Sequence, residues 1–253
     1  MRNLLLLFAL IIFGYVGPAK ALVLSDIETE IRVQIDDNTS ASRQRYSDTR
    51  LDSIINEAQK EIINVTWCLE KSTSIVISTM TAYYQLPTDL IAIQQGGVRY
   101  TIDASTSTND DITVLPETSR TKIYQDNPEW ASETGEPTSY WIRQDTNTVL
   151  WLAVSPTPTT SSTGTLTMTY YCQGTDLSSD SDVPFLGYNF LYPYHIALAY
   201  YTTARIKLIE GEVAEAQAYM QLYQNVIVVM KDRLGQMPNY SPQGRAWEPR
   251  PSK

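Results

Sequence analysis

The stretch Thr165-Leu166-Thr167-Met168-Thr169-Tyr170 alternates strictly between threonine and a larger apolar or aromatic side chain. Because successive side chains of a β-strand point to opposite faces, this period of two predicts a strand. We expect the apolar side chains to face a core and the threonines to face water or another subunit. The pattern therefore predicts an antiparallel sheet that is apolar on one face only.

Other segments upstream have the same strand chemistry. They are Ser74–Ser78, Leu90–Ile93, Val98–Ile102, Ile112–Leu115, Ser139–Arg143 and Thr148–Val154. Gly96-Gly97 predicts a turn between the second and third of these, and Asp145-Thr146-Asn147 predicts a hairpin between the last two. The polar run 103–111 predicts a loop. Together these segments predict a β-rich part over 72–175.

Helical spacing flanks this part on both sides. Leu24, Ile27, Ile31 and Ile35 predict one helix, and Leu51, Ile54, Ile55, Ala58 and Ile62 predict a second, behind the start signal Ser47-Asp48. After the β-rich part, 190–209 predicts a helix, and Tyr219, Leu222, Tyr223, Val226 and Met230 predict a last one that ends near Gly235. We expect Glu210-Gly211-Glu212 to separate these last two helices. The expected divisions are 22–71, 72–175, 176–235 and an extended, proline-rich tail over 236–253.

Charge limits the range of partners. The 253-residue chain carries a formal net charge of -9, and without residues 1–21, which carry only Arg2 and Lys20, it has 17 basic against 28 acidic residues, or -11. So acidic a surface repels phosphate, which argues against nonspecific nucleic-acid binding. The 17 tyrosines and five tryptophans are typical of subunit contacts, and equally of the rims of a β-rich core.

The first 21 residues have the form of a secretory signal. Leu4 to Val16 is almost unbroken apolar sequence, and Ala19-Lys20-Ala21 has the small-x-small form of a cleavage site. Thirteen residues are short for a membrane span. The sequence predicts either a cleaved peptide or a retained apolar arm packed against a neighbouring subunit.

The sequence contains little that is typical of catalytic, metal-binding or cofactor sites. The chain has one histidine, His195, which we expect to be a hydrogen-bonded core or interface residue because it lies in an aromatic helix start. Asp176, Asp180 and Asp182 form the one carboxylate cluster, but the turn glycine and closing glutamate of a calcium loop are missing. We expect no enzyme activity, no metal and no cofactor.

Cys68 and Cys172 are the only cysteines. Nothing in their spacing shows proximity, so we expect two buried free thiols. A disulfide between them in an oxidising compartment is the alternative.

A series of short motifs runs through the chain in a fixed order. The residues that carry it are Tyr84, Leu86, Pro87, Asp89, Pro128, Trp130, Gly135, Pro137, Tyr140, Trp151, Pro156 and Pro158. In this order, and between helical ends, they resemble the head-to-tail adaptor (connector, or head completion) proteins of tailed bacteriophages. The resemblance covers Leu24 to Leu234.

The resemblance implies an α+β fold in which N- and C-terminal helices form a bundle and an antiparallel β-rich part is inserted between them. It implies a structural virion protein at the head-tail junction, assembled in the host cytoplasm. Similar proteins form a homo-oligomeric ring, usually a dodecamer, which binds the portal protein, extends the DNA channel without gripping DNA, and provides a platform for tail proteins such as a tail tube, a nozzle or a further adaptor.

Residues of the C-terminal helix and of the proline-rich tail are the candidates for the portal and subunit interfaces, because an extended segment with aromatic anchors can dock in a cleft. They are Tyr219, Tyr223, Met237, Tyr240 and Trp247. The alternative function is a secreted or periplasmic β-rich binding module with a cleaved signal peptide. That alternative explains the N-terminus but not the ordered motifs.

Overall fold

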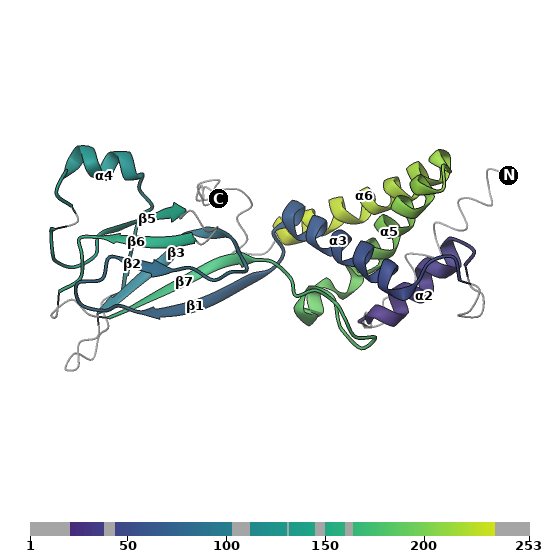
Figure 1. The fold of residues 1–253 in the computed structure, drawn as a ribbon, viewed down its shortest axis with the longest axis horizontal. Coiled ribbons are helices and arrows are strands. Elements are labelled where there is room, and N and C mark those ends of the chain that lie inside the picture. Colours follow the sequence, from purple (N-terminus) through teal and green to yellow (C-terminus); the bar gives the residue numbers. More distant parts are fainter. Residues whose placement is uncertain are drawn as a thin grey trace, which may run out of the picture. The chain divides into compact units, whose positions relative to one another are not determined.

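The computed structural model describes residues 21–37, 44–102, 112–130, 132–144, 150–159 and 164–235. They form two compact units. The first consists of the described residues of Met1–Ile62 and Gly174–Arg233, and the second of those of Ile63–Gln173 and Leu234–Lys253. Helices make up the first unit and antiparallel sheets dominate the second (Figure 1). The predicted α+β class with antiparallel sheets is confirmed.

The described residues of the first unit form four α-helices and two short 3-10 segments. They are α2 (Leu24–Gln34), α3 (Asp48–Thr66), η3 (Phe185–Gly187), η4 (Asn189–Tyr194), α5 (Ile196–Ile209) and α6 (Val213–Gly235), of which α3 and α6 extend into the second unit by their last residues. The apolar stripes predicted for α2 and α3 are buried, with no member more than 4% exposed. Gly211, at φ +83°, makes the turn between α5 and α6, as expected.

The predicted helix over 190–209 is wrong at its start. Residues 189–194 form η4, which contains Pro193, and α5 begins only at Ile196. Proline has no N–H to donate and biases the residue before it away from α-helical geometry. The aromatic run before His195 therefore coils as a short 3-10 segment.

The strands described in the second unit form two antiparallel sheets. The four-stranded sheet has the order β1 (Glu70–Val76), β7 (Gly164–Cys172), β3 (Leu90–Ile102), β4 (Ile112–Val114). The three-stranded sheet has the order β2 (Tyr83–Gln85), β6 (Leu150–Ser155), β5 (Ser139–Gln144). The predicted pairing of the last two strands before β7 is confirmed, whereas residues 145–149 between them lie outside the described residues.

The strand that decides the fold behaves as its alternation predicts. On β7 Leu166 and Met168 are fully buried, while Thr165, Thr167 and Thr169 are half-buried on the other face. Within this unit the three-stranded sheet lies between the four-stranded sheet and α4 (Arg120–Asp126) (Figure 1). The hydroxyl face of β7 thus belongs to the outer face of the four-stranded sheet.

The predicted turn at Gly96-Gly97 is wrong. Leu90 to Ile102 form one long strand, and the pairing with β7 shifts register between Ile93 and Val98. A Cβ on Gly97 would lie 2.5 Å from the carbonyl oxygen of Thr169. The glycines therefore make a β-bulge pressed against the neighbouring strand, where no side chain fits.

Candidate functional site

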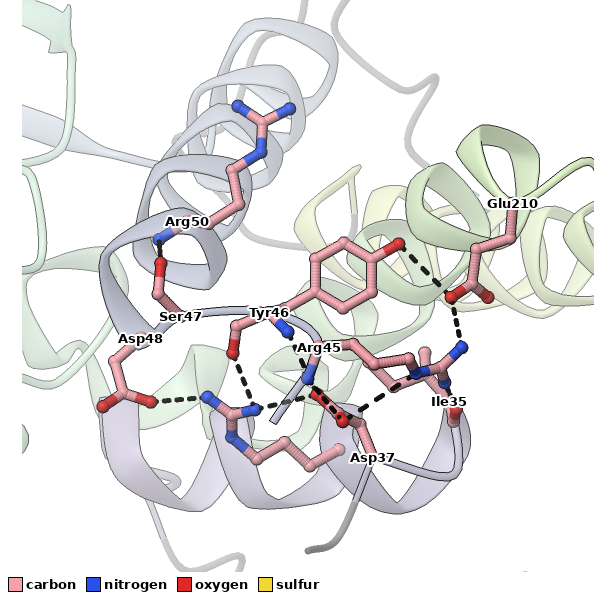
Figure 2. Close-up of polar contacts among 9 residues, drawn as sticks. Ile35, Asp37, Arg45, Tyr46, Ser47, Asp48, Arg50 and Glu210 are labelled. Carbon is pink, nitrogen blue, oxygen red and sulfur yellow. Dashed lines mark hydrogen bonds and ion pairs between the residues drawn. The ribbon is translucent and has the colours of Figure 1, made fainter. Parts of the chain in front are cut away.

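A network of ion pairs joins the end of α2, the segment before α3 and the α5–α6 turn. Arg32 is 7% exposed, and its guanidinium donates to Asp37 at 3.2 Å, to the carbonyl oxygen of Tyr46 at 3.0 Å and to Asp48 at 2.5 Å. Asp37, 2% exposed, also accepts from the backbone N–H groups of Arg45 at 2.9 Å and Tyr46 at 3.3 Å (Figure 2). A buried carboxylate with this many donors is well compensated.

The α5–α6 turn is held by the same network. Glu210 accepts from the Arg45 guanidinium at 2.7 Å and from the Tyr46 hydroxyl at 3.3 Å (Figure 2). Arg45 also donates to the backbone carbonyl of Ile35. Burial, followed by the negative charge of Glu210, raises the pKa of Tyr46. The α5–α6 turn is thereby fixed to the segment before α3 and to the end of α2, although Glu210 follows Arg45 by 165 residues.

Glu28 lies among carboxylates of the same unit. Burial, then a hydrogen bond with Asp52 and the charges of Asp52, Asp48 and Asp180, raise the pKa of Glu28 to about 8. Two carboxyl groups that share one proton can lie side by side without repulsion. Burial and the neighbouring carboxylates thus favour the neutral form of Glu28 at the contact between α2 and α3.

His195 is the buried, hydrogen-bonded core histidine that was predicted. It is fully buried, and its Nδ1 lies 3.1 Å from the carbonyl oxygen of Leu22, to which a neutral ring can donate. Phe185 and Tyr192 pack against the ring at 5.6 Å and 5.3 Å between centroids. Burial lowers the pKa of His195 to about 4, so the ring is neutral at pH 7.

Helix α6 has two apolar faces. One is buried and consists of Ala216, Tyr223, Ile227, Met230 and Leu234. The other is open: Leu222 is 43% exposed, Val228 66% and Val229 60%. Between Ala216 and Met230 the helix carries no charged side chain. We call the exposed residues of this stretch the uncharged outer face of α6. It combines these apolar side chains with the exposed amides of Gln217, Gln221, Gln224 and Asn225, and exposed apolar side chains on an uncharged surface are typical of a protein contact.

Tryptophans fill the space between α4 and the three-stranded sheet. Trp130 and Trp141 stack edge to face at 4.5 Å between centroids and are 2% and 3% exposed. Ile123 of α4, Ala153 and Tyr83 complete the cluster. It anchors the irregular segment before β5 to the sheet.

A cavity of about 270 Å³ lies beside α4. Its lining residues are Pro116, Glu117, Thr118, Lys122, Ile123, Asp126, Asn127, Ser139 and Ser155.

In the described part of the chain, no group of three or more His, Cys, Asp or Glu is placed to hold a metal ion. Nor is any described helix long and apolar enough to cross a membrane.

A match to a known protein family covers every helix and strand described above. Residues 24–246 match the family described as SU10 adaptor protein. The chain belongs to the SU10 adaptor family. The predicted resemblance to phage head-tail adaptors is thereby confirmed. No curated protein matches the chain.

An SU10 adaptor has a structural role in a phage particle. Membership of this family therefore does not favour the alternative function, a secreted binding module. The cysteines agree with this choice. Cys68 and Cys172 are both buried and free, as predicted, and burial raises the pKa of Cys68 to about 12. The signal-like segment 1–20 lies outside the described residues.

The motif residues of the SU10 adaptor lie mostly on the three-stranded sheet and the segments that border it. Tyr84 pairs with Leu152 across β2 and β6, and its hydroxyl donates to the carbonyl oxygen of Thr81 at 2.7 Å. Gly135 N–H donates to the carbonyl oxygen of Thr157, between Pro156 and Pro158, at 2.9 Å. The structure thus brings the middle and the end of the motif series together.

Asp89 ties this series to the four-stranded sheet. Its carboxylate accepts from Lys71 of β1 at 2.6 Å and from the hydroxyl of Tyr170 of β7 at 3.1 Å. The pKa of Tyr170 rises to about 12, chiefly through burial and then through the Asp89 charge. Asp89 thus joins the turn after β2 to β1 and β7.

Two of the aromatic interface candidates lie on α6 and contact α5. Tyr223 is 7% exposed and packs against Tyr201 at 5.2 Å between centroids, while Tyr219 is half-buried and lies 6.4 Å from Tyr200. Met237, Tyr240 and Trp247 lie outside the described residues.

The Arg32 network and α4 were not predicted. A weak signal for the first is Arg32 directly after the core residue Ile31, with Asp37 five residues on. For α4 the signal is Ser119, whose hydroxyl accepts from the N–H of Lys122 as an N-cap.

Proposed function

We propose that this SU10 adaptor protein forms a homo-oligomeric ring, of twelve copies, that docks on the portal, extends the DNA channel and provides the tail attachment platform at the head-tail junction. In this proposal the helices of 22–71 and 176–235 act as one bundle that carries the inserted part 72–175. The tail 236–253 reaches the portal. DNA passes through the channel without specific binding.

The observation that carries the proposal is the uncharged outer face of α6. Family membership gives a structural role, and such a role requires surfaces that recognise other proteins. Leu222, Val228 and Val229 expose apolar side chains on a helix whose opposite face is already buried. Because the water-exposed parts of these valine and leucine side chains add little to the fold of a single copy, we assign this face to a protein contact.

The charge of the chain suits the proposed channel. A net charge of -9 disfavours tight binding of the DNA phosphates, so DNA can slide. Tyr219, Tyr223, Met237, Tyr240 and Trp247 stay our candidates for the portal and subunit contacts.

The test is a phage that lacks this chain. We expect heads that package DNA but carry no tails, seen by electron microscopy, and recovery of tailed particles when the wild-type gene is supplied in trans. Tailed, infectious particles without the chain would overturn the adaptor role.

The α6 contact is tested separately in the same complementation. We expect Leu222→Lys combined with Val229→Lys to lower the yield of tailed particles at least tenfold, because two charges would enter an apolar contact. The matched control is Val33→Lys on α2, which also charges an exposed valine (56% exposed). Full recovery by the α6 variant would refute this contact.

A further inference from the structure

The four-stranded sheet has two open edges, and β1 forms one of them. The N–H of Ile77 donates to Gly164, and Leu69 accepts from Cys172, so the odd-numbered residues of this strand share their backbone groups with β7. In an antiparallel ladder the residues between them point their N–H and C=O groups the other way. Ser72, Ser74 and Val76 therefore direct these groups outward.

Strand β4 forms the opposite edge in the same manner. The N–H of Leu115 donates to Val98 of β3, so Ile112 and Val114 direct their backbone groups away from the sheet. Within the described ranges, the outward backbone groups of Ser74, Val76, Ile112 and Val114 have no hydrogen-bond partner.

Exposed apolar side chains stand at both edges and share one face. Val76 pairs with Thr165, Thr165 with Thr101, and Thr101 with Ile112, so Val76 and Ile112 end one cross-strand row. Val76 is 75% exposed, Ile112 61% and Val114 52%. The interior of the row is threonine and its two ends are apolar.

These edges lack the usual protection against pairing with another chain. Proteins that must stay monomeric place charges or proline on edge strands. In β1 only the first two residues, Glu70 and Lys71, are charged, and residues 72–76 and 112–114 contain neither charge nor proline. In a chain of net charge -9, these two uncharged stretches can also meet without like-charge repulsion.

The direction of the strands fits a head-to-tail contact. All three pairings in the sheet are antiparallel, so β1 and β4 run in opposite directions. If a second copy continues the sheet, its β1 lies antiparallel to β4 of the first, and Val76 comes beside Ile112 or Val114. Such a contact joins two different surfaces, which is what a closed ring requires.

We propose that β1 of one copy pairs with β4 of the next copy, so that neighbouring subunits share one continuous sheet. The partner is a second copy of this chain, and the proposal rests on the proposed ring. It specifies which surfaces meet, which the ring alone does not.

The test is disulfide trapping in tailed particles that carry Val76→Cys together with Ile112→Cys or Val114→Cys. Within one copy these positions are three strands apart, about 14 Å at ~4.8 Å per strand, whereas a disulfide needs Cα atoms within about 7 Å. Any bond between them must therefore join two copies. The native Cys68 and Cys172 are buried and do not compete.

After mild oxidation, we expect a ladder of covalent multimers on a non-reducing gel from at least one double variant. The single variants should give no species beyond a dimer, and neither should the control Val76→Cys with Val33→Cys. Tailed particles whose double variants stay monomeric would overturn the shared sheet while leaving the adaptor role intact. Dimers alone would also overturn it, because they would show like edges meeting. The adaptor role itself fails only in the separate deletion experiment.

Discussion

The Arg32 network and the edges of the four-stranded sheet differ in their polar groups, which have hydrogen-bond partners in the network, whereas the outward backbone groups at the edges lack them among the residues that the structure describes. Both oxygens of the buried Asp37 carboxylate accept hydrogen bonds, and Arg32 alone makes three hydrogen bonds. At β1 and β4 a row of backbone groups is left open beside exposed Val76 and Ile112. A polar group is costly when buried without a partner and cheap when it faces water.

The two regions therefore have different roles, one in the folding of a single copy and the other in assembly. The network fixes the helical unit of a single copy, so changes there should act on folding. The open edges contribute little to a single copy, so changes there should act on assembly.

The largest expected effect comes from Arg32→Met, which keeps the side-chain volume but removes the cation. Asp37 would stay buried without its closest guanidinium, and breaking a buried pair costs about 3–5 kcal/mol of unfolding free energy. Urea unfolding followed by circular dichroism measures it. The control is Arg205→Met, whose ion pair with Glu57 at 3.1 Å is exposed, with an expected loss below about 1 kcal/mol. Equal losses would refute the special role of the network.

A pH effect of about 2 kcal/mol is expected from His195. Its folded pKa of about 4 lies below the unfolded value of 6.5, so the unfolded state binds the extra proton between these values. Stability from the neutral ring is therefore complete above pH 6.5 and is lost as pH falls toward 4.

The measurement is the difference in unfolding free energy between wild type and His195→Phe at pH 7 and pH 4.5. Glu28, whose raised pKa gives the opposite slope from about pH 4.5 to 8, is present in both proteins and cancels. Wild type should lose about 2 kcal/mol relative to the variant at the lower pH. A constant difference would show that His195 is not held neutral.

Gly97→Ala tests the interior of the sheet that carries the open edges. The new Cβ would lie 2.5 Å from the oxygen of Thr169 and 2.7 Å from that of Gln94, so the backbone must move, at about 1–2 kcal/mol. Thermal unfolding measures the loss. Gly235→Ala is the control, because no atom lies within 4 Å of its added Cβ. If Gly97→Ala is as stable as wild type, the bulge is not pressed against β7.

Gly97 also shows where sequence reasoning stops. Periodicity places β7 and the stripes of α2 and α3 correctly, because each pattern depends on neighbours close in sequence. The bulge depends on Thr169, which lies 72 residues away, so a glycine pair reads locally as a turn. For the same reason the stripe predicted on α6 includes Leu222, which is 43% exposed.

Of the candidate functional features, some can be predicted from local sequence and others only from the sheet order. The series of Pro, Gly and Trp residues identifies the family from order alone, because turns and cores constrain these residues locally. The open edges are invisible in the sequence, because Val76 and Ile112 read as ordinary strand residues until the sheet order places each of them at an edge.

The smallest expected effect on stability, and the sharpest on assembly, comes from Val76→Lys. The side chain is 75% exposed, so the free energy of unfolding of a single copy should change by no more than about 0.5 kcal/mol. A lysine on an edge strand, however, opposes pairing with a second chain, because its charge would enter the contact beside Ile112 or Val114. We therefore expect wild-type thermal stability with at least a tenfold loss of tailed particles in complementation, and Val33→Lys should lose neither. A variant that melts earlier in proportion to its lost assembly would show that β1 stabilises the single copy, and the separation of the two regions would fail.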